Sequence, residues 1–280
     1  MDQQSLESIL VDLHLPGIRF LNTVDSTNDE AWRWIENGAP HGALVIADEQ
    51  TAGRGRLQRH WTTAAGSGLA FSLVLLSPPL DPRLLSRLIG VGSVATCLAL
   101  RSQYCLPAQV KWPNDILLDQ RKAGGVLVEA RWNGEVLQGV VIGIGINIAP
   151  KSVNPDILPT EQLSFPATCI EDALGRPVDR MELLHAILLE FFSWFPKLNL
   201  PDFMEAWENC LAYRNQWVEL SSWNEALQSA QEPALPQVTI GKVIGLNADG
   251  SLQLMARSGK LVTAQVGEIH LRPTSFPQPG

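Results

Sequence analysis

The stretch AGGVLVEARWNGEVLQGVVIGIGINI, residues 123–148, does most to decide the fold. Two apolar-rich segments, Ala123–Arg131 and Val136–Ile148, flank the dipeptide Asn133-Gly134, which favours the tight turn of a β-hairpin. We therefore predict two long antiparallel strands. The closely spaced glycines of the second segment superficially resemble a dinucleotide-binding loop, but no helical pattern follows them, so the strand–turn–helix context of that motif is missing.

Further strands and helices are predicted on both sides of this hairpin. The stretch 50–67 has no hydrophobic period and is expected to be a long loop. Asp81-Pro82 is expected to begin a helix, and Thr27 with Glu30 fits the capping box of an earlier one. Other predicted elements are strands at Ile18–Val24, Ala43–Ala47 and Gly68–Leu76 and helices at Asp179–Trp194 and Asp202–Tyr213. Together they predict an α+β fold with a mixed, mostly antiparallel sheet and flanking helices.

The sequence changes character from about Gln228. SAQEPALPQ, residues 229–237, is polar and contains two prolines, which is typical of a linker. Four short strands with turn residues between them are expected after it, at Val238–Leu246, Leu252–Ala256, Leu261–Val266 and Ile269–Arg272. We predict one domain over residues 1–225 and a small SH3-like β-barrel over residues 226–280.

Composition narrows the class of protein. The 280 residues carry a formal net charge of −8, which disfavours a DNA-binding surface. Four scattered cysteines without a C-x-x-C pair suit reduced thiols in the cytoplasm rather than disulfides or a zinc site, and no metal site is predicted. The apolar runs are too short to cross a bilayer, so no membrane association is expected.

The first candidate site is the stretch Gln50-Thr51-Ala52-Gly53-Arg54-Gly55-Arg56. Glycines let a backbone approach a ligand closely, and the arginines offer planar forks that match carboxylate or phosphate groups. A solvated basic loop is the alternative explanation for this composition.

The second candidate is Lys111-Trp112-Pro113-Asn114-Asp115, followed by Arg121-Lys122-Ala123-Gly124-Gly125. A lysine that faces a cavity neutralises both an attacking carboxylate and the phosphate it attacks. A tight turn with surface lysines would give the same pattern. In the third candidate, Gly143–Asn147, the glycines leave room for a ligand or serve packing, and Asn147 offers an amide at the strand end.

Five motifs, taken in order, resemble those of the biotin protein ligases. The resemblance runs from about Ile18 to Pro273 and includes the C-terminal barrel. Its motifs are Asp25–Asn28, the 50–56 stretch with Trp61 beyond it, Lys111–Asp115, Arg121–Gly125 and Gly143–Asn147.

The resemblance implies a class II synthetase-like catalytic domain and a two-step, AMP-forming reaction. The carboxylate of biotin attacks the α-phosphorus of ATP, which gives biotinyl-AMP and pyrophosphate. A lysine of the biotin carboxyl carrier protein of acetyl-CoA carboxylase then takes the biotinyl group and releases AMP. ATP and biotin are the implied substrates, and Mg²⁺ is expected with ATP.

The resemblance also implies roles for individual residues. Lys122, Arg54 and Arg56 are the implied catalytic residues, with Lys122 at the centre. The implied biotin contacts are Ser26, Thr27, Asn28, Gln50, Gly53, Arg54, Gly55, Arg56, Lys122 and Gly124. The implied nucleotide contacts are Trp61, Lys111, Asn114, Asp115 and Asn147. Leu69, Phe71 and Val126 are candidates for lining an apolar slot or, equally, for the core.

Some members of this family carry an additional DNA-binding domain. Because the first predicted strand begins at Ile18, we expect the short, enzyme-only form. Monomer and homodimer are both compatible with the sequence. Two other functions remain open from the residues: a ligase for lipoate or octanoate on the same fold, and a binding module for biotin or a nucleotide without catalysis.

Overall fold

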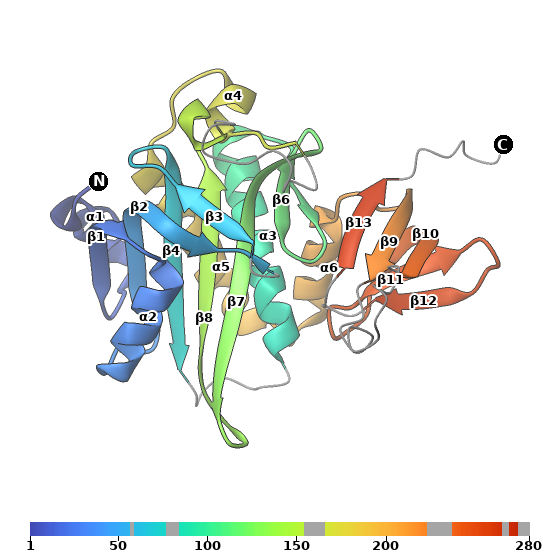
Figure 1. The fold of residues 1–280 in the computed structure, drawn as a ribbon, viewed down its shortest axis with the longest axis horizontal. Helices are drawn as coiled ribbons and strands as arrows, with labels where there is room; N and C mark the ends of the chain where they lie inside the picture. The colour runs from blue at the N-terminus through green and yellow to red at the C-terminus, as the bar shows by residue number, and fades with distance from the viewer. Residues whose placement is uncertain (57–58, 77–83, 154–165, 223–236, 265–268, 274–280) are drawn as a thin grey trace, which may run out of the picture.

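The computed structural model of the chain describes residues 1–56, 59–76, 84–153, 166–222, 237–264 and 269–273. Its strands form a larger sheet, which helices cover, and a smaller C-terminal sheet beside it (Figure 1). Within the described part of the chain, no helix combines the length and apolar character needed to cross a membrane.

The larger sheet has eight strands in the order β1-β2-β4-β8-β7-β6-β5, and β3 pairs with β2 outside this path. The β1–β2 pair is parallel and all other pairs are antiparallel, which confirms the predicted mixed, mostly antiparallel sheet. Its strands are β1 (Ile18–Val24), β2 (Leu44–Arg54), β3 (His60–Thr63), β4 (Gly68–Leu76), β5 (Gln109–Lys111), β6 (Asp115–Leu118), β7 (Arg121–Asn133) and β8 (Val136–Asn147). The predicted hairpin is β7–β8, turned at Gly134 with a positive φ of 58°.

Helices cover both faces of this sheet (Figure 1). Side chains alternate between the faces along a strand, so Leu73 of β4 joins the large core with α3 and α5, whereas Val74 packs with α2 on the other face. The helices are α1 (Gln3–Ile9), α2 (Thr27–Glu36), α3 (Leu85–Tyr104), α4 (Ile170–Leu174), α5 (Arg180–Trp194) and α6 (Pro201–Cys210). The face that carries α2 is also the face that carries the candidate site.

The smaller sheet is antiparallel throughout, with strand order β12-β11-β10-β9-β13. Its strands are β9 (Trp217–Ser222), β10 (Gln237–Leu246), β11 (Leu252–Ala256), β12 (Leu261–Ala264) and β13 (Ile269–Pro273). Its size agrees with the predicted SH3-like unit. The four predicted strands are present, but β9 was not predicted. Because β9 lies before residue 226, the sheet includes residues from the predicted first domain, and the domain division itself stays a prediction.

A turn of the smaller sheet contacts the larger unit. The backbone carbonyls of Ala248, Asp249 and Gly250 accept hydrogen bonds from side chains of α3 and of the β5–β6 turn. The indole nitrogen of Trp112 donates to the carbonyl of Gly250 at 3.0 Å. Through Trp112, this contact reaches the same turn that holds the second candidate site.

Two local predictions were wrong and two lie outside the described residues. The expected loop at 50–67 begins as strand, because β2 runs to Arg54 and pairs with β3, a tertiary pairing that no local pattern announces. The N-cap of α2 is Ser26, and Thr27 is the first helical residue. The predicted helix start at Asp81-Pro82 and the linker at 229–236 fall in undescribed segments.

Candidate functional site

The first part of the site is a buried polar cluster where α2 begins. Thr27 donates to the side-chain oxygen of Gln50 through both its backbone N–H, at 2.8 Å, and its hydroxyl, at 3.0 Å. Ser72 of β4 lies 2.8 Å from the hydroxyl of Thr27 and 2.6 Å from the amide oxygen of Asn28. Ser26, the N-cap, is buried beside them.

This polar cluster has fewer hydroxyl protons than contacts that need them. Three contacts join the oxygens of Gln50, Thr27, Ser72 and Asn28 in a row, yet only Thr27 and Ser72 carry a hydroxyl hydrogen. Two protons therefore serve three oxygen–oxygen contacts. The lone pairs that remain on these oxygens are acceptors for a ligand with N–H donors.

The second part is an ion cluster around Arg54 at the end of β2. One guanidinium nitrogen of Arg54 donates to Asp29 of α2, and the other lies 3.0 Å from both carboxylate oxygens of Glu129 on β7. The hydrogen bond to Asp29 is the main cause that raises the pKa of Arg54. Because two carboxylates surround this one cation, the local charge is negative.

The third part is a positive cluster around Asn114 and Asp115. Arg56 donates to the amide oxygen of Asn114 at 3.1 Å. The carboxylate of Asp115 lies 2.6 Å from the ammonium of Lys122 and 3.3 Å from that of Lys111. Residues from the loop after β2, from the β5–β6 turn and from β7 thus meet at one point.

Burial shifts several pKa values in this positive cluster. Burial lowers the pKa of Arg56 and of Lys111, although Asp115 opposes the shift in both. Burial alone would raise the pKa of Asp115, but Lys122 and then Lys111 outweigh it and hold that pKa at about 2. Asp115 is therefore ionised at neutral pH. Such shifts are typical of sites that bind or transform charged ligands.

Glycines keep the sheet surface flat between these clusters. A Cβ atom at Gly145 would lie 2.5 Å from the indole of Trp61, so that ring rests on the backbone of β8. Gly124, two residues before Val126, belongs to the opposite face, where a Cβ atom would lie 2.8 Å from the carbonyl oxygen of Gly145. The ammonium of Lys122 lies 5.7 Å from the Trp61 ring centroid, within reach of a cation–π interaction.

Asn147 at the end of β8 faces a different partner. Its amide nitrogen donates to the carbonyl of Thr168 at 3.1 Å, and the backbone N–H of Thr168 donates to the carbonyl of Lys122 at 2.9 Å. Asn147 is thereby connected to Lys122 through one intervening residue.

The structure thus brings most of the predicted site residues into neighbouring clusters on one sheet face. Gly53 lies against the backbone of Trp61 and the side chain of Gln50, and the N–H of Gly55 donates to the carbonyl of Arg59 at 2.7 Å. Their roles toward a ligand stay predictions. Three residues were predicted either to line an apolar slot or to belong to the core. They lie in the core on the opposite face of the sheet: Leu69, Phe71 and Val126.

Sequence reasoning missed Asp29, Ser72 and Glu129. Ser72 and Glu129 are isolated in the sequence and join the site through the packing of β4 and β7, whereas Asp29 directly follows the Asp25–Asn28 motif on α2. The polar residue Ser72, in the apolar run of β4, was the one available signal.

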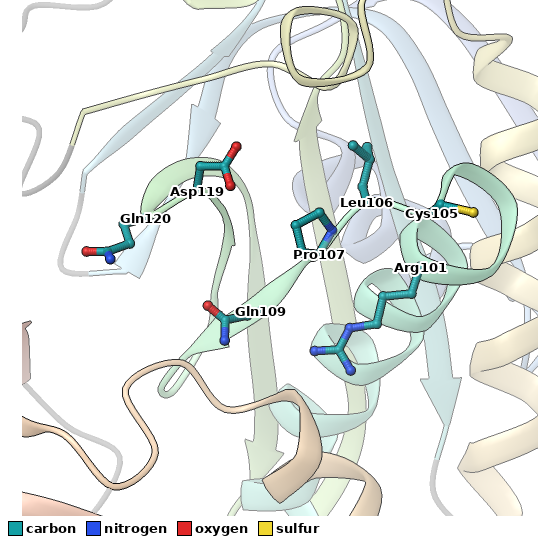
Figure 2. A pocket seen from close by; sticks show the side chains of 7 residues that line it. All are labelled: Arg101, Cys105, Leu106, Pro107, Gln109, Asp119 and Gln120. Carbon is teal, nitrogen blue, oxygen red and sulfur yellow. The ribbon is translucent and has the colours of Figure 1, made fainter.

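Two further observations concern other parts of the molecule. A hollow of about 560 Å³ lies between the C-terminal end of α3 and the β6–β7 turn, with Arg101, Cys105 and Asp119 among its lining residues (Figure 2). None of the predicted site residues lines it. Among the described residues, no group of three or more His, Cys, Asp and Glu side chains is arranged to hold a metal ion.

Comparison with known proteins places the chain in a family. The profile of the "Biotin/lipoate A/B protein ligase family" matches residues 20–147. The chain is 36% identical over 172 residues to the bifunctional ligase/repressor BirA of Bacillus spizizenii, an alignment that covers 61% of this chain and 51% of that protein. The match to BirA of Bacillus subtilis also covers 51% of that relative, so the aligned part spans about half the length of either protein.

Two other relatives are covered more fully. The structure is similar to the biotin protein ligase from Aquifex aeolicus in complex with biotin and ATP, with a TM-score of 0.73 and 27% identity, covering 92% of this chain and 100% of that one. The chain is 35% identical over 201 residues to the biotin–[acetyl-CoA-carboxylase] ligase of Paracoccus denitrificans, covering 71% of this chain and 78% of the relative. By this match, the chain belongs to the biotin protein ligase family.

Proposed function

We propose that the protein is an ATP-dependent biotin–protein ligase. It joins the carboxylate of biotin to AMP and then passes the biotinyl group to a lysine of a biotin carboxyl carrier protein. The observation that carries this proposal is the meeting of Arg56, Lys111 and Lys122 around Asn114 and Asp115. A reaction between two anions needs such fixed cations in a partly dry site.

In the first step, a carboxylate oxygen of biotin attacks the α-phosphorus of ATP, and the bond to pyrophosphate breaks. In this proposal Lys122 neutralises both the carboxylate and the phosphate, and Arg56 stabilises the phosphate. In the second step, the amine of the carrier lysine attacks the acyl carbon and AMP leaves. Mg²⁺ is expected to arrive with ATP, since substrate phosphates commonly supply its ligands.

The polar cluster supports biotin as the acid. The ureido ring of biotin carries two N–H donors, and the row of oxygens from Gln50 to Asn28 is short of donors. The dithiolane ring of lipoate and the alkyl chain of octanoate carry no N–H group. The Paracoccus relative is named for acetyl-CoA carboxylase, so we propose the carrier protein of that enzyme as the partner and the cytoplasm as the location.

The test is a pyrophosphate-release assay with ATP, Mg²⁺ and biotin, followed by mass spectrometry of an apo carrier domain. We expect biotin-dependent pyrophosphate and one modified carrier lysine. Pyrophosphate release with lipoate but not with biotin would show that lipoate is the substrate. Binding of biotin without pyrophosphate release or carrier modification would show that the protein is a binding module.

Lys122→Met tests the central cation. We expect pyrophosphate release to fall by about a hundredfold or more, the scale of losing one electrostatic contact in a transition state. Lys260→Met is the matched control, because Lys260 is exposed in the connection between β11 and β12. Equal rates in the two variants would remove Lys122 from this role.

A further inference from the structure

Glu129 joins two parts of the candidate site that the chain supplies from different elements. It lies on β7, and Val141 of β8 lies directly opposite it in the register. Val141 packs with α2, so Glu129 faces the same side of the sheet. Its carboxylate accepts hydrogen bonds from both Asn28 and Arg54.

The contact with Asn28 determines which way the amide of that residue points. Its nitrogen donates to Glu129 at 2.7 Å, and its oxygen accepts from Ser72 at 2.6 Å. A flipped amide would turn its oxygen toward a carboxylate, which has no proton to give. The amide also lies directly against the backbone of Gly143, where a Cβ atom would collide with it. Glu129 therefore fixes the donor and acceptor pattern at the start of α2.

The contact with Arg54 anchors the beginning of the arginine-containing segment. Arg54 is the last residue of β2, and Arg56, which reaches Asn114, follows two residues later. Two carboxylates hold the guanidinium of Arg54, so its fork is already occupied. This geometry suits a residue that holds the segment in place better than one that contacts phosphate.

We propose that Glu129 is a positioning residue for biotin, which orients the amide of Asn28 and anchors Arg54 without touching the reacting atoms. The inference rests on the proposed function. Glu129 stands apart from the positive cluster, whose cations contact Asn114 and Asp115. Because Asp29 still holds Arg54 when Glu129 is lost, the segment that leads to Arg56 stays anchored. The loss of Glu129 should therefore weaken the capture of biotin and leave the capture of ATP nearly unchanged.

Glu129→Gln is the main test. Glutamine removes the negative charge that accepts from both Asn28 and Arg54. Both carboxylate oxygens of Glu129 lie 3.0 Å from the Arg54 guanidinium, so in the variant an amide N–H donor faces that guanidinium. In the pyrophosphate assay we expect the KM for biotin to rise about tenfold or more, as for the loss of a hydrogen bond to a charged group, while the KM for ATP changes less than about twofold. Equal rises in both constants would indicate a general structural role and overturn the proposal.

Asp29→Asn is the matched control. It also removes one negative charge beside Arg54, but the described partners of the Asn28 amide are Glu129 and Ser72 rather than Asp29, so we expect a smaller rise in the KM for biotin. Glu129→Asp keeps a carboxylate, so its KM for biotin is expected to lie between those of the wild type and Glu129→Gln. If Glu129→Gln does not fold, a raised KM for biotin in Glu129→Asp is the expected result. A wild-type KM in Glu129→Asp together with equal effects of Glu129→Gln and Asp29→Asn would overturn the proposal.

The unsubstituted protein separates this proposal from the proposed function. If it releases pyrophosphate with biotin and Glu129→Gln has the wild-type KM for biotin, only the role of Glu129 is refuted. If the unsubstituted protein neither binds nor uses biotin, the function is refuted, and the inference with it.

Discussion

Asp115 is the carboxylate on which the positive cluster depends, and Asp115→Asn measures that dependence. Its side chain is 16% exposed and contacts the ammonium groups of Lys122 and Lys111. The pKa of Asp115 is lowered from 3.8 to about 2, and each pKa unit corresponds to about 1.4 kcal/mol. Ionised Asp115 therefore stabilises the fold by about 2 to 3 kcal/mol, and the asparagine variant should lose about that much at neutral pH.

The pH dependence of this loss follows from the direction of the shift. A carboxylate whose pKa is lowered by folding stabilises the folded state fully above its unfolded pKa, 3.8, and loses that contribution as the pH falls toward about 2. The difference in unfolding free energy between the wild type and Asp115→Asn should stay constant from pH 7 to about pH 5. Below that pH it should shrink.

Urea unfolding followed by circular dichroism measures both effects. Asp119→Asn is the matched control, because Asp119 is exposed at a turn with a positive φ of 47°, which asparagine adopts readily. We expect less than about 0.5 kcal/mol from this control. A similarly small effect of Asp115→Asn at pH 7, or a difference that grows on acidification, would refute the electrostatic reasoning.

Two further substitutions test the packing around the site. Gly145→Ala should lower the unfolding free energy by about 1 to 3 kcal/mol, because the new methyl group meets the indole of Trp61 at 2.5 Å; the loss should largely disappear in a Trp61→Ala background, and an equal loss there would contradict this cause. Tyr213→Phe should raise the unfolding free energy by about 1 kcal/mol in the same urea assay, because the buried Tyr213 hydroxyl has no hydrogen-bond partner among the described residues; a loss of stability would show that this hydroxyl is satisfied after all.

Most of the larger sheet was predictable because its signals are local. Asn133-Gly134 between two apolar-rich segments identifies the β7–β8 hairpin, and Asp179 caps α5 by accepting from the N–H groups of Met181 and Glu182. The end of β2 was not predictable, because Gly53 and Arg54 become strand only through pairing with β3. The same limit applies to β9, whose partners β10 and β13 lie later in the chain.

In the candidate site, too, residues close together in the sequence were predictable and residues joined by long-range contacts were not. Lys111, Asn114, Asp115 and Lys122 stand close together in the sequence, and the β6–β7 hairpin brings them into contact. Glu129 gives no such signal, because its partners lie 101 and 75 residues away along the chain. A residue whose role depends on long-range pairing becomes visible only when the sheet is assembled.

The distribution of charge over the site determines how biotin would lie in it. At one end, two carboxylates, Asp29 and Glu129, are paired with Arg54, so a further carboxylate there would be repelled. At the other end, the ammonium groups of Lys122 and Lys111 both contact the carboxylate of Asp115, and Arg56 lies beside them on Asn114, so an anion there would be attracted. Biotin has a neutral ureido ring and an anionic tail. In the proposed reaction, the ring therefore lies toward the start of α2 and the tail toward Lys122, since the opposite orientation would place the carboxylate against Glu129 and far from the cation that must activate it.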